Sequence, residues 1–170
     1  DPRAYGRILR PIAEAGFEVV IFKQPYNLAI LDSNAASAVI GDPDDGVDQW
    51  IVGGHSLGGA MASRYAERER DELIGLLLFA AYTVNDLSAR TDLAVMSIYG
   101  TADGVADPGD IARRMSDLPA TAEFVPIDGA IHSFFGDYGL QRGDGTPTVS
   151  REDAQRQIAD STIRFLTSLE

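Results

Sequence analysis

The chain has 170 residues, 45% of them hydrophobic and 24% charged, which predicts a single globular domain over residues 1–170. Its formal net charge of −12 argues against nucleic acid and anionic membrane surfaces as partners, because both require a basic face. The absence of cysteine excludes disulfides, thiolate metal sites and a cysteine nucleophile. No apolar run reaches membrane-spanning length, so we expect no membrane insertion in this segment.

Helical and extended patterns alternate along the chain without repeats or linkers. The expected elements are, in chain order, a helix at residues 2–15, a strand at 17–22, a short helix at 34–40, a turn cluster at 41–46, a strand at 49–53, a helix at 57–70, strands at 73–80 and 93–99, a helix at 108–118, a strand at 122–127 and a helix at 150–169.

This alternation predicts an α/β fold with a mostly parallel sheet and helices on both faces. The runs at 73–80 and 93–99 are almost entirely apolar, which is typical of strands buried on both faces. In such sheets the ligand site lies beyond the carboxyl ends of the strands. We therefore expect the catalytic residues in the loops that follow strands.

A glycine-rich turn, Gly54-His55-Ser56-Leu57-Gly58-Gly59, joins an expected strand to an expected helix. In a sharp turn of this kind a serine hydroxyl is lifted above the sheet edge, and the positions two before and two after it must be small. Gly54 and Gly58 meet this requirement, and the helix N-terminus supplies N–H groups for a developing negative charge. Ser56 is the candidate nucleophile. The competing interpretation is a glycine-rich turn with an inert serine, and a phosphate-binding loop is disfavoured because no lysine follows the glycines.

An aspartate follows another buried strand, in the loop Gly100-Thr101-Ala102-Asp103-Gly104. A histidine base needs a carboxylate that holds its tautomer and stabilises the imidazolium, and Asp103 is the candidate. An aspartate in a glycine-rich loop is also a common turn residue. Two rivals stay open: Asp107, which could instead cap the next helix, and Asp86, which follows an earlier strand.

The chain contains only two histidines. His55 is adjacent to Ser56, and neighbouring side chains at a sharp turn point apart, so it is a poor base for that serine. His132 follows the strand expected at 122–127 and is the candidate base by elimination. A loop histidine on its own is more often a surface residue. Here the order serine, aspartate, histidine, each after its own strand, favours catalysis.

Three segments resemble the α/β-hydrolase superfamily: the turn around Ser56, Tyr99-Gly100-Thr101-Ala102-Asp103-Gly104, and the late His132. The resemblance is nearest to the small, lidless, dienelactone-hydrolase-like members, to which Asn27-Leu28-Ala29 and the stretch from His132 to Gly139 are also similar. It covers nearly the whole chain. It implies a three-layer fold around an eight-stranded sheet, and hydrolysis of carboxylic esters or related acyl compounds without a cofactor. Dienelactone hydrolases carry a nucleophilic cysteine, so Ser56 favours ordinary ester chemistry.

The resemblance also places the oxyanion donors. One is the backbone N–H after the nucleophile, which here belongs to Leu57. The other comes from a loop between an early strand and the first main helix, and in this chain that helix starts near Pro2. We therefore expect the N-terminal strands to be missing and the domain to be N-terminally incomplete. Loss of one donor costs about 10²–10³ in turnover. A bared sheet edge predicts pairing with a missing N-terminal segment or a homo-oligomer.

These residues predict acyl transfer from a small-molecule ester to Ser56, with His132 as general base and Asp103 orienting it. Tyr82, Phe134 and Phe135 lie in loops at the active edge and are candidates for pocket walls, with packing in the core or at the rim as an equal alternative.

Two acidic loops, Asp42-Pro43-Asp44-Asp45 and Gly143-Asp144-Gly145, have neither the spacing nor the ligand number of a calcium loop. We expect turns there and predict no metal site.

Three other functions fit parts of the pattern. An acyltransferase or thioesterase would use the same triad with another acceptor. A non-catalytic, hydrolase-like binding protein would account for a missing oxyanion donor. A dinucleotide-binding domain is disfavoured, because no Gly-x-Gly-x-x-Gly turn follows the first strand.

Overall fold

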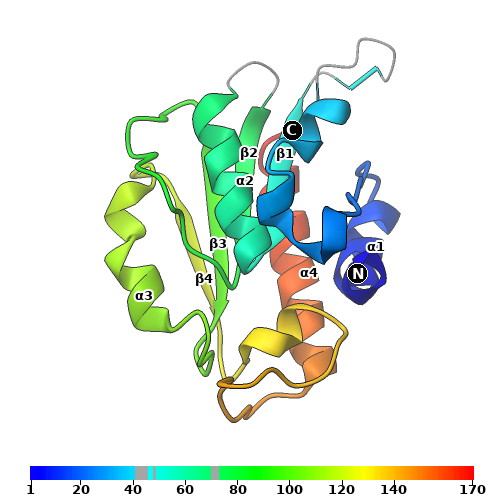
Figure 1. Cartoon of the computed structure of the whole chain (residues 1–170), viewed down its shortest axis with the longest axis vertical. Coiled ribbons are helices and arrows are strands. Elements are labelled where there is room, and N and C mark those ends of the chain that lie inside the picture. The colour runs from blue at the N-terminus through cyan, green and yellow to red at the C-terminus, as the bar shows by residue number, and fades with distance from the viewer. Residues whose placement is uncertain (41–45, 48, 70–72) are drawn as a thin grey trace.

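The computed structural model describes residues 1–40, 46–47, 49–69 and 73–170, and the statements below refer to these residues. Its helices and strands, labelled in Figure 1, are α1 (Gly6–Glu14), β1 (Trp50–His55), α2 (Leu57–Arg68), β2 (Leu73–Phe79), β3 (Ala94–Gly100), α3 (Pro108–Arg113), β4 (Glu123–Ile127) and α4 (Arg151–Thr167). Short 3₁₀ helices occur at Pro2–Tyr5, Pro25–Asn27, Ala29–Leu31, Ala35–Ala38, Met115–Asp117 and His132–Phe135. Within this part of the chain, no helix combines the length and apolarity needed to cross a membrane.

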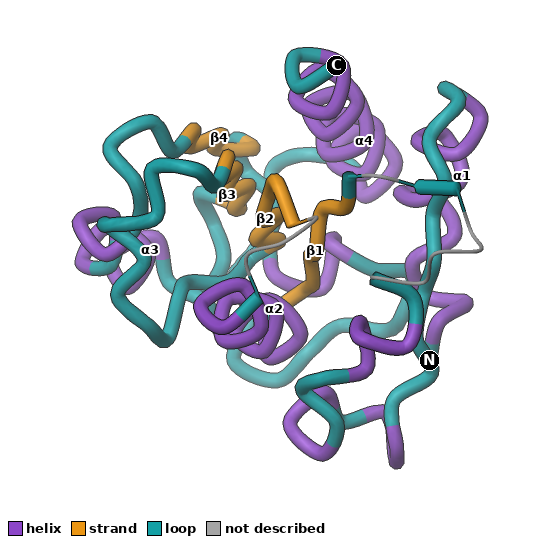
Figure 2. Tube along the Cα trace, turned by 90° about the horizontal axis from the view of Figure 1, so that it is seen from above, coloured by secondary structure: helices purple, strands orange, loops and turns teal. Residues whose placement is uncertain are grey.

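The four strands form one parallel sheet in the order β1-β2-β3-β4 (Figure 2). Neighbouring strands end in register, with His55 opposite Phe79 and Gly100 opposite Ile127. Because all strands run the same way, their carboxyl ends meet at one edge of the sheet. The loops after β1, β3 and β4 therefore start close together.

Alternate residues of the buried strands pack into two separate cores. Leu76 and Leu78 of β2 lie in a core with the apolar face of α2, whereas Leu77 and Phe79 lie in a second core with α1 and α4. Figure 2 shows these helices on opposite sides of the sheet. The period of two along a strand explains this division, because successive side chains point to opposite faces. The fold is thus a three-layer α/β architecture, as the alternating pattern predicts.

The prediction of a strand at residues 17–22 is wrong. These residues lie outside the sheet and follow α1 without regular secondary structure, although their β-branched and aromatic side chains favour a strand. A strand is stable only when a neighbour completes its backbone hydrogen bonds, and local propensity does not supply one. The described sheet consequently has four strands, not the eight that the family resemblance implies.

Two smaller expectations also change. The helix expected at 108–118 is divided into α3 and the 3₁₀ turn Met115–Asp117, and the one expected at 34–40 is only the 3₁₀ turn Ala35–Ala38. Most of the turn cluster at 41–46, including the acidic loop Asp42-Pro43-Asp44-Asp45, lies outside the described residues.

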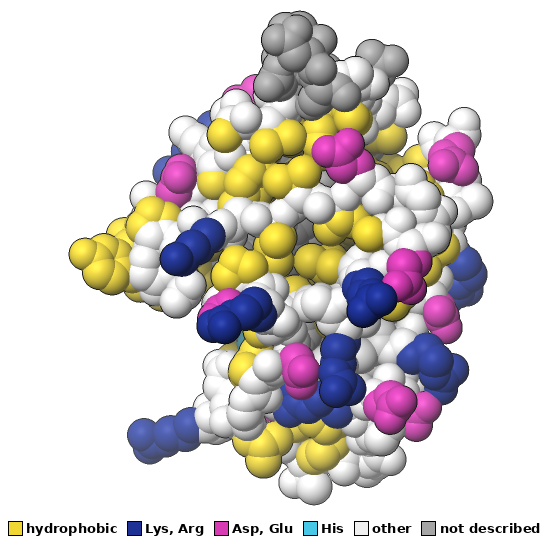
Figure 3. Space-filling model, turned by 90° about the vertical axis from the view of Figure 1, so that its right-hand side faces the viewer, with side chains coloured by type: hydrophobic (Ala, Val, Ile, Leu, Met, Phe, Trp, Pro, Cys, Tyr) yellow, Lys and Arg dark blue, Asp and Glu magenta, His cyan; other side chains and the backbone are white. Residues whose placement is uncertain are grey.

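A cavity of about 1160 Å³ lies beside the free edge of the sheet. Its lining includes all of β1, the extended residues 17–22 and parts of α1 and α2. Figure 3, which views the side of the molecule that carries α1, shows hydrophobic side chains gathered across this face. The N-terminal segment contributes the following exposed large hydrophobic residues: Val20, Ile21, Tyr26, Leu28, Ile30 and Leu31.

The turn between β1 and α2 has a strained backbone at Ser56, whose φ is 54° and ψ is −123°. A non-glycine residue at positive φ is uncommon and persists only where its surroundings hold it. The Ser56 N–H donates to the Phe79 carbonyl at the end of β2, which anchors the turn to the sheet. Close packing completes the support: a Cβ on Gly54 would collide with the backbone of Gly58 and Gly59.

Gly58 does not have the role that the motif predicts for it. A Cβ on Gly58 would meet no atom within 4 Å, because this position faces the cavity. The crowded partner of Gly54 is Gly59, whose Cβ would lie 2.5 Å from the Ala81 side chain and 2.7 Å from the Gly54 carbonyl. Crowding thus constrains Gly54 and Gly59.

We therefore expect Gly54→Ala and Gly59→Ala to destabilise the fold by about 1–3 kcal/mol or more, since the added methyl groups have no space. Gly58→Ala is the matched control and should leave stability unchanged or raise it by up to about 1 kcal/mol, because alanine favours a helix over glycine. Urea unfolding measures all three. Equal loss in Gly58→Ala and Gly54→Ala would contradict this account of the turn.

Candidate active site

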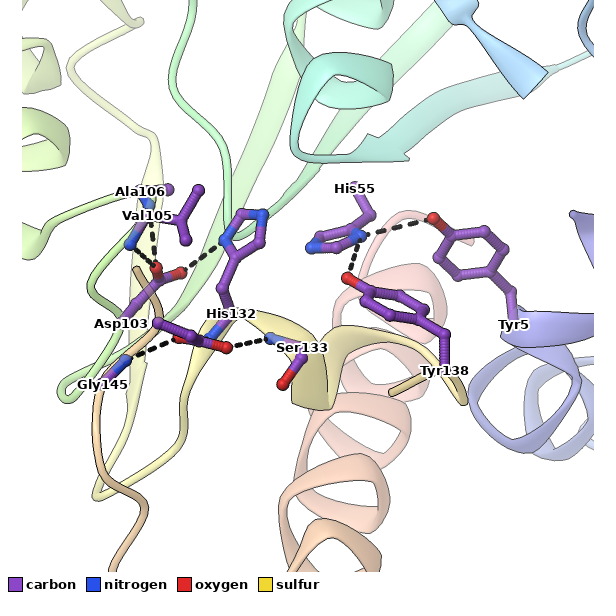
Figure 4. A network of polar contacts seen from close by, with 10 residues as sticks. Tyr5, His55, Asp103, Val105, Ala106, His132, Ser133, Tyr138 and Gly145 are labelled. Atoms are coloured by element: carbon purple, nitrogen blue, oxygen red, sulfur yellow. Dashed lines mark hydrogen bonds and ion pairs between the residues drawn. The ribbon is translucent and has the colours of Figure 1, made fainter. Parts of the chain in front are cut away.

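The structure brings two of the three candidate triad residues into direct contact. His132 Nδ1 lies 2.8 Å from Asp103 Oδ2 (Figure 4). Their side chains are 1% and 0% exposed, so water does not compete for this bond. Since an ionised carboxylate only accepts, the imidazole donates from Nδ1, which leaves Nε2 as the proton acceptor.

Asp103 is held by its own loop. Its Oδ1 atom accepts hydrogen bonds from the backbone N–H groups of Val105 and Ala106, each at 2.8 Å. With His132, three donors surround this buried carboxylate. A buried charge is tolerated when it is hydrogen-bonded in this way, and the same bonds fix the direction in which the carboxylate points.

His132 and Ser56 line the same cavity. Within the described residues, His132 Nε2 is buried and makes no hydrogen bond, so it is not bonded to the Ser56 hydroxyl. The His132 ring centroid lies 4.6 Å from that of His55, the residue before Ser56. The His132 ring thus packs against the residue that precedes Ser56. Catalytic hydrogen bonds are often long before substrate binds, so the unbonded Nε2 is compatible with a role as base.

Leu57 is the first residue of α2 and also lines the cavity. The first N–H groups of a helix have no acceptor within the helix. The Leu57 N–H is accordingly placed at the start of a helix dipole, beside the serine that precedes it.

His55 is surrounded by aromatic rings. Its Nδ1 lies 3.3 Å from the Tyr5 hydroxyl and 3.4 Å from the Tyr138 hydroxyl (Figure 4). Its ring also stacks on Phe135, with the ring centroids 5.9 Å apart. Burial, followed by the nearby His132, lowers the pKa of His55 to about 3. Burial also raises the pKa of Tyr5 and Tyr138, so both hydroxyls stay protonated at neutral pH.

Asp144, which the sequence suggests is a turn residue, lies beside the candidate base. Its carboxylate accepts from the backbone N–H groups of His132 at 2.9 Å and Ser133 at 2.8 Å, and also from Gly145. Burial opposes ionisation, but the N–H donors of Ser133, His132 and Gly145 outweigh it and lower the pKa of Asp144. No spacing signal identifies this role, because the bonded residues are 11 and 12 positions away.

The two rival carboxylates have other partners. Asp107 caps α3 by accepting from the Gly109 N–H at 2.7 Å. Asp86 accepts from the N–H and hydroxyl of Ser88 in its own turn. Asp103 is thus the one of these three carboxylates that contacts His132.

The three aromatic residues considered for pocket walls do not line the cavity. Phe135 is fully buried in the core and stacks on His55. Phe134 lies in the same core, with the Arg151 guanidinium 4.7 Å above its ring. Tyr82 lies on the surface after β2. Packing therefore accounts for both phenylalanines.

Among the described residues, no group of three or more histidine, aspartate or glutamate side chains is arranged to hold a metal ion.

Comparison with known proteins identifies the family. The family model described as "Alpha/beta hydrolase family" matches residues 1–156. None of the curated proteins matches the chain closely enough in sequence to add to this result.

Solved structures of low sequence identity share the fold. A monoacylglycerol lipase from Paleococcus ferrophilus is 15% identical, with a TM-score of 0.66 over 95% of this chain and 89% of that one. A thermophilic esterase from Thermogutta terrifontis is 13% identical, with a TM-score of 0.66 over 98% and 86%. A dienelactone-hydrolase-like promiscuous phosphotriesterase from metagenomic libraries is 16% identical, with a TM-score of 0.61 over 81% and 59%. With the family model covering most of its length, this chain belongs to the α/β-hydrolase family.

Proposed function

We propose that this hydrolase cleaves carboxylic esters or related acyl compounds through a Ser56–His132–Asp103 triad. The buried contact between His132 and Asp103 carries the proposal, because it leaves Nε2 as the proton acceptor of a histidine that lines the same cavity as Ser56. The strained turn at Ser56 supports it, since strain of this kind concentrates at functional sites.

The mechanism follows from these positions. His132 Nε2 takes the proton of the Ser56 hydroxyl as it attacks the ester carbonyl, and then protonates the leaving alcohol. Asp103 holds the imidazole tautomer and stabilises the imidazolium. The Leu57 N–H stabilises the oxyanion of the tetrahedral intermediate. Water, activated by the same imidazole, then releases the acid from Ser56.

His55 is not the base in this mechanism. Its pKa of about 3 makes it a weak proton acceptor at neutral pH, and its Nδ1 is already within hydrogen-bond distance of two tyrosine hydroxyls. His55 is therefore a neutral side chain that packs against the His132 ring and lines the cavity.

The nucleophile is tested with a fluorophosphonate probe, which labels activated serines. We expect the wild-type chain and the surface control Ser88→Ala to label, Ser56→Ala not to label, and His132→Gln to label at least roughly 10⁴-fold more slowly. A folded wild-type chain that stays unlabelled would support a non-catalytic, hydrolase-like binding protein. Formation of a new ester in excess added alcohol, in place of free acid, would instead indicate an acyltransferase.

The carboxylate is tested by a matched pair of substitutions. Asp103→Asn should lower kcat for p-nitrophenyl ester hydrolysis about 10⁴-fold, because the amide no longer favours the required tautomer of His132. Asp107→Asn should keep the wild-type rate, since this residue only caps α3. Equal losses in the two variants would remove the assignment of Asp103.

The neutral state of His55 makes stability depend on pH. An unfolded histidine gains its proton near pH 6.5, whereas folded His55 gains it near 3, so acid favours the unfolded chain across this window. The free energy of unfolding should fall by about 1.4 kcal/mol for each pH unit well below 6.5 on account of this residue. Urea unfolding at about pH 7, 6 and 5 should show a flatter dependence in His55→Asn than in the wild type. Parallel curves would mean that folded His55 titrates normally.

A further inference from the structure

We propose that Asp144 is a positioning residue that holds the main chain of His132 in its catalytic orientation. This inference rests on the proposed function of His132 as general base. Asp144 touches neither substrate nor reacting atoms in this role, and acts only through the backbone of the 3₁₀ turn His132–Phe135 that carries the base.

Two of the three N–H groups that Asp144 binds belong to a turn without access to water. His132 is 1% exposed and Ser133 is fully buried. The Oδ1 atom accepts from the His132 N–H and the Oδ2 atom from the Ser133 N–H, so one side chain binds both donors. Without this carboxylate, the turn would have to shift to satisfy two buried donors, and such a shift would move the imidazole relative to Asp103.

The Asp144 loop is also packed on the loop that carries Asp103. A Cβ on Gly145 would collide with the Ala102 carbonyl, and one on Gly104 would collide with the Gly143 carbonyl. The loop that carries Asp144 therefore packs against the Asp103 loop, while the Asp144 side chain binds the His132 turn. Through this placement it fixes the distance between the base and its carboxylate, which neither loop defines alone.

The other end of the turn is held by a positive charge. Arg151, at the start of α4, donates from Nη1 to the carbonyls of Ser133 and Gly136, each at 2.6 Å. The carboxylate thus binds N–H groups of the turn and the guanidinium binds carbonyl groups, so each charge meets the matching end of a peptide dipole. Asp144 thus supplies one half of a two-ended support, whose other half comes from α4.

The test compares Asp144→Ala and Asp144→Asn with Asp86→Ala. Asp86 is the matched control, because it is also a loop carboxylate that accepts a backbone N–H but does not contact His132. We expect kcat for ester hydrolysis to fall about 10- to 100-fold in Asp144→Ala with KM unchanged, as for a small misplacement of a catalytic group. Asp144→Asn keeps an acceptor for one of the two N–H groups, so its kcat should lie between those of Asp144→Ala and the wild type. The kcat of Asp86→Ala should equal that of the wild type.

Proton NMR supplies a readout that does not need turnover. The proton that His132 donates to Asp103 should resonate downfield of the amide protons and disappear in His132→Gln. We expect it to shift or broaden in folded Asp144→Ala and, if that variant does not fold, in Asp144→Asn. An unchanged resonance and kcat, with only a lower Tm, would show a merely structural role and overturn the proposal. An inert Ser56 in the wild type would refute the proposed function, while the NMR comparison would still decide whether Asp144 positions His132.

Discussion

The contact between His132 and Asp103 depends on β3 and β4 being parallel neighbours. Their hydrogen-bond pattern continues beyond the strands, where the Thr101 N–H donates to the Ile127 carbonyl and the Ala102 N–H to the Ala130 carbonyl. This continuation brings the loop that carries Asp103 against the loop that carries His132. It also leaves no room at Gly100, where a Cβ would collide with the Ala130 carbonyl. The pairing of β3 with β4 thus determines how close the Asp103 loop lies to the His132 loop.

Backbone N–H groups supply most of the polar support in this region. Asp103 is bound by two of them and Asp144 by three, and no lysine or arginine among the described residues forms an ion pair with either carboxylate. Backbone donors are fixed by the fold, and they need little reorganisation when charge develops on the imidazole. Burial strengthens such bonds, because the surroundings screen charge less than water does. The same bonds therefore stabilise the loops and fix the positions of the two carboxylates.

The sequence predicts the parts of this molecule that depend on local patterns. Apolar runs mark β2 and β3, and the turn around Ser56 reveals the junction of β1 and α2. The chain order of serine, aspartate and histidine identifies two residues that the structure brings into contact. Features that depend on residues far away in the sequence cannot be predicted from local patterns. Residues 17–22 have the composition of a strand, but no strand in the described part of the chain pairs with them. Asp144 binds N–H groups that are 11 and 12 positions away in the sequence.

The supports of the base and most of the cavity wall come from different parts of the chain. Asp103, Asp144 and Arg151 hold His132 and its turn, and none of them lines the cavity, whose walls are built largely from the first 40 residues and β1. Substitutions in this N-terminal wall therefore change the shape of the cavity while the contacts of Asp103, Asp144 and Arg151 stay in place. Under the proposed function, residues 17–22 are thus the region in which substrate range can be altered separately from the support of His132.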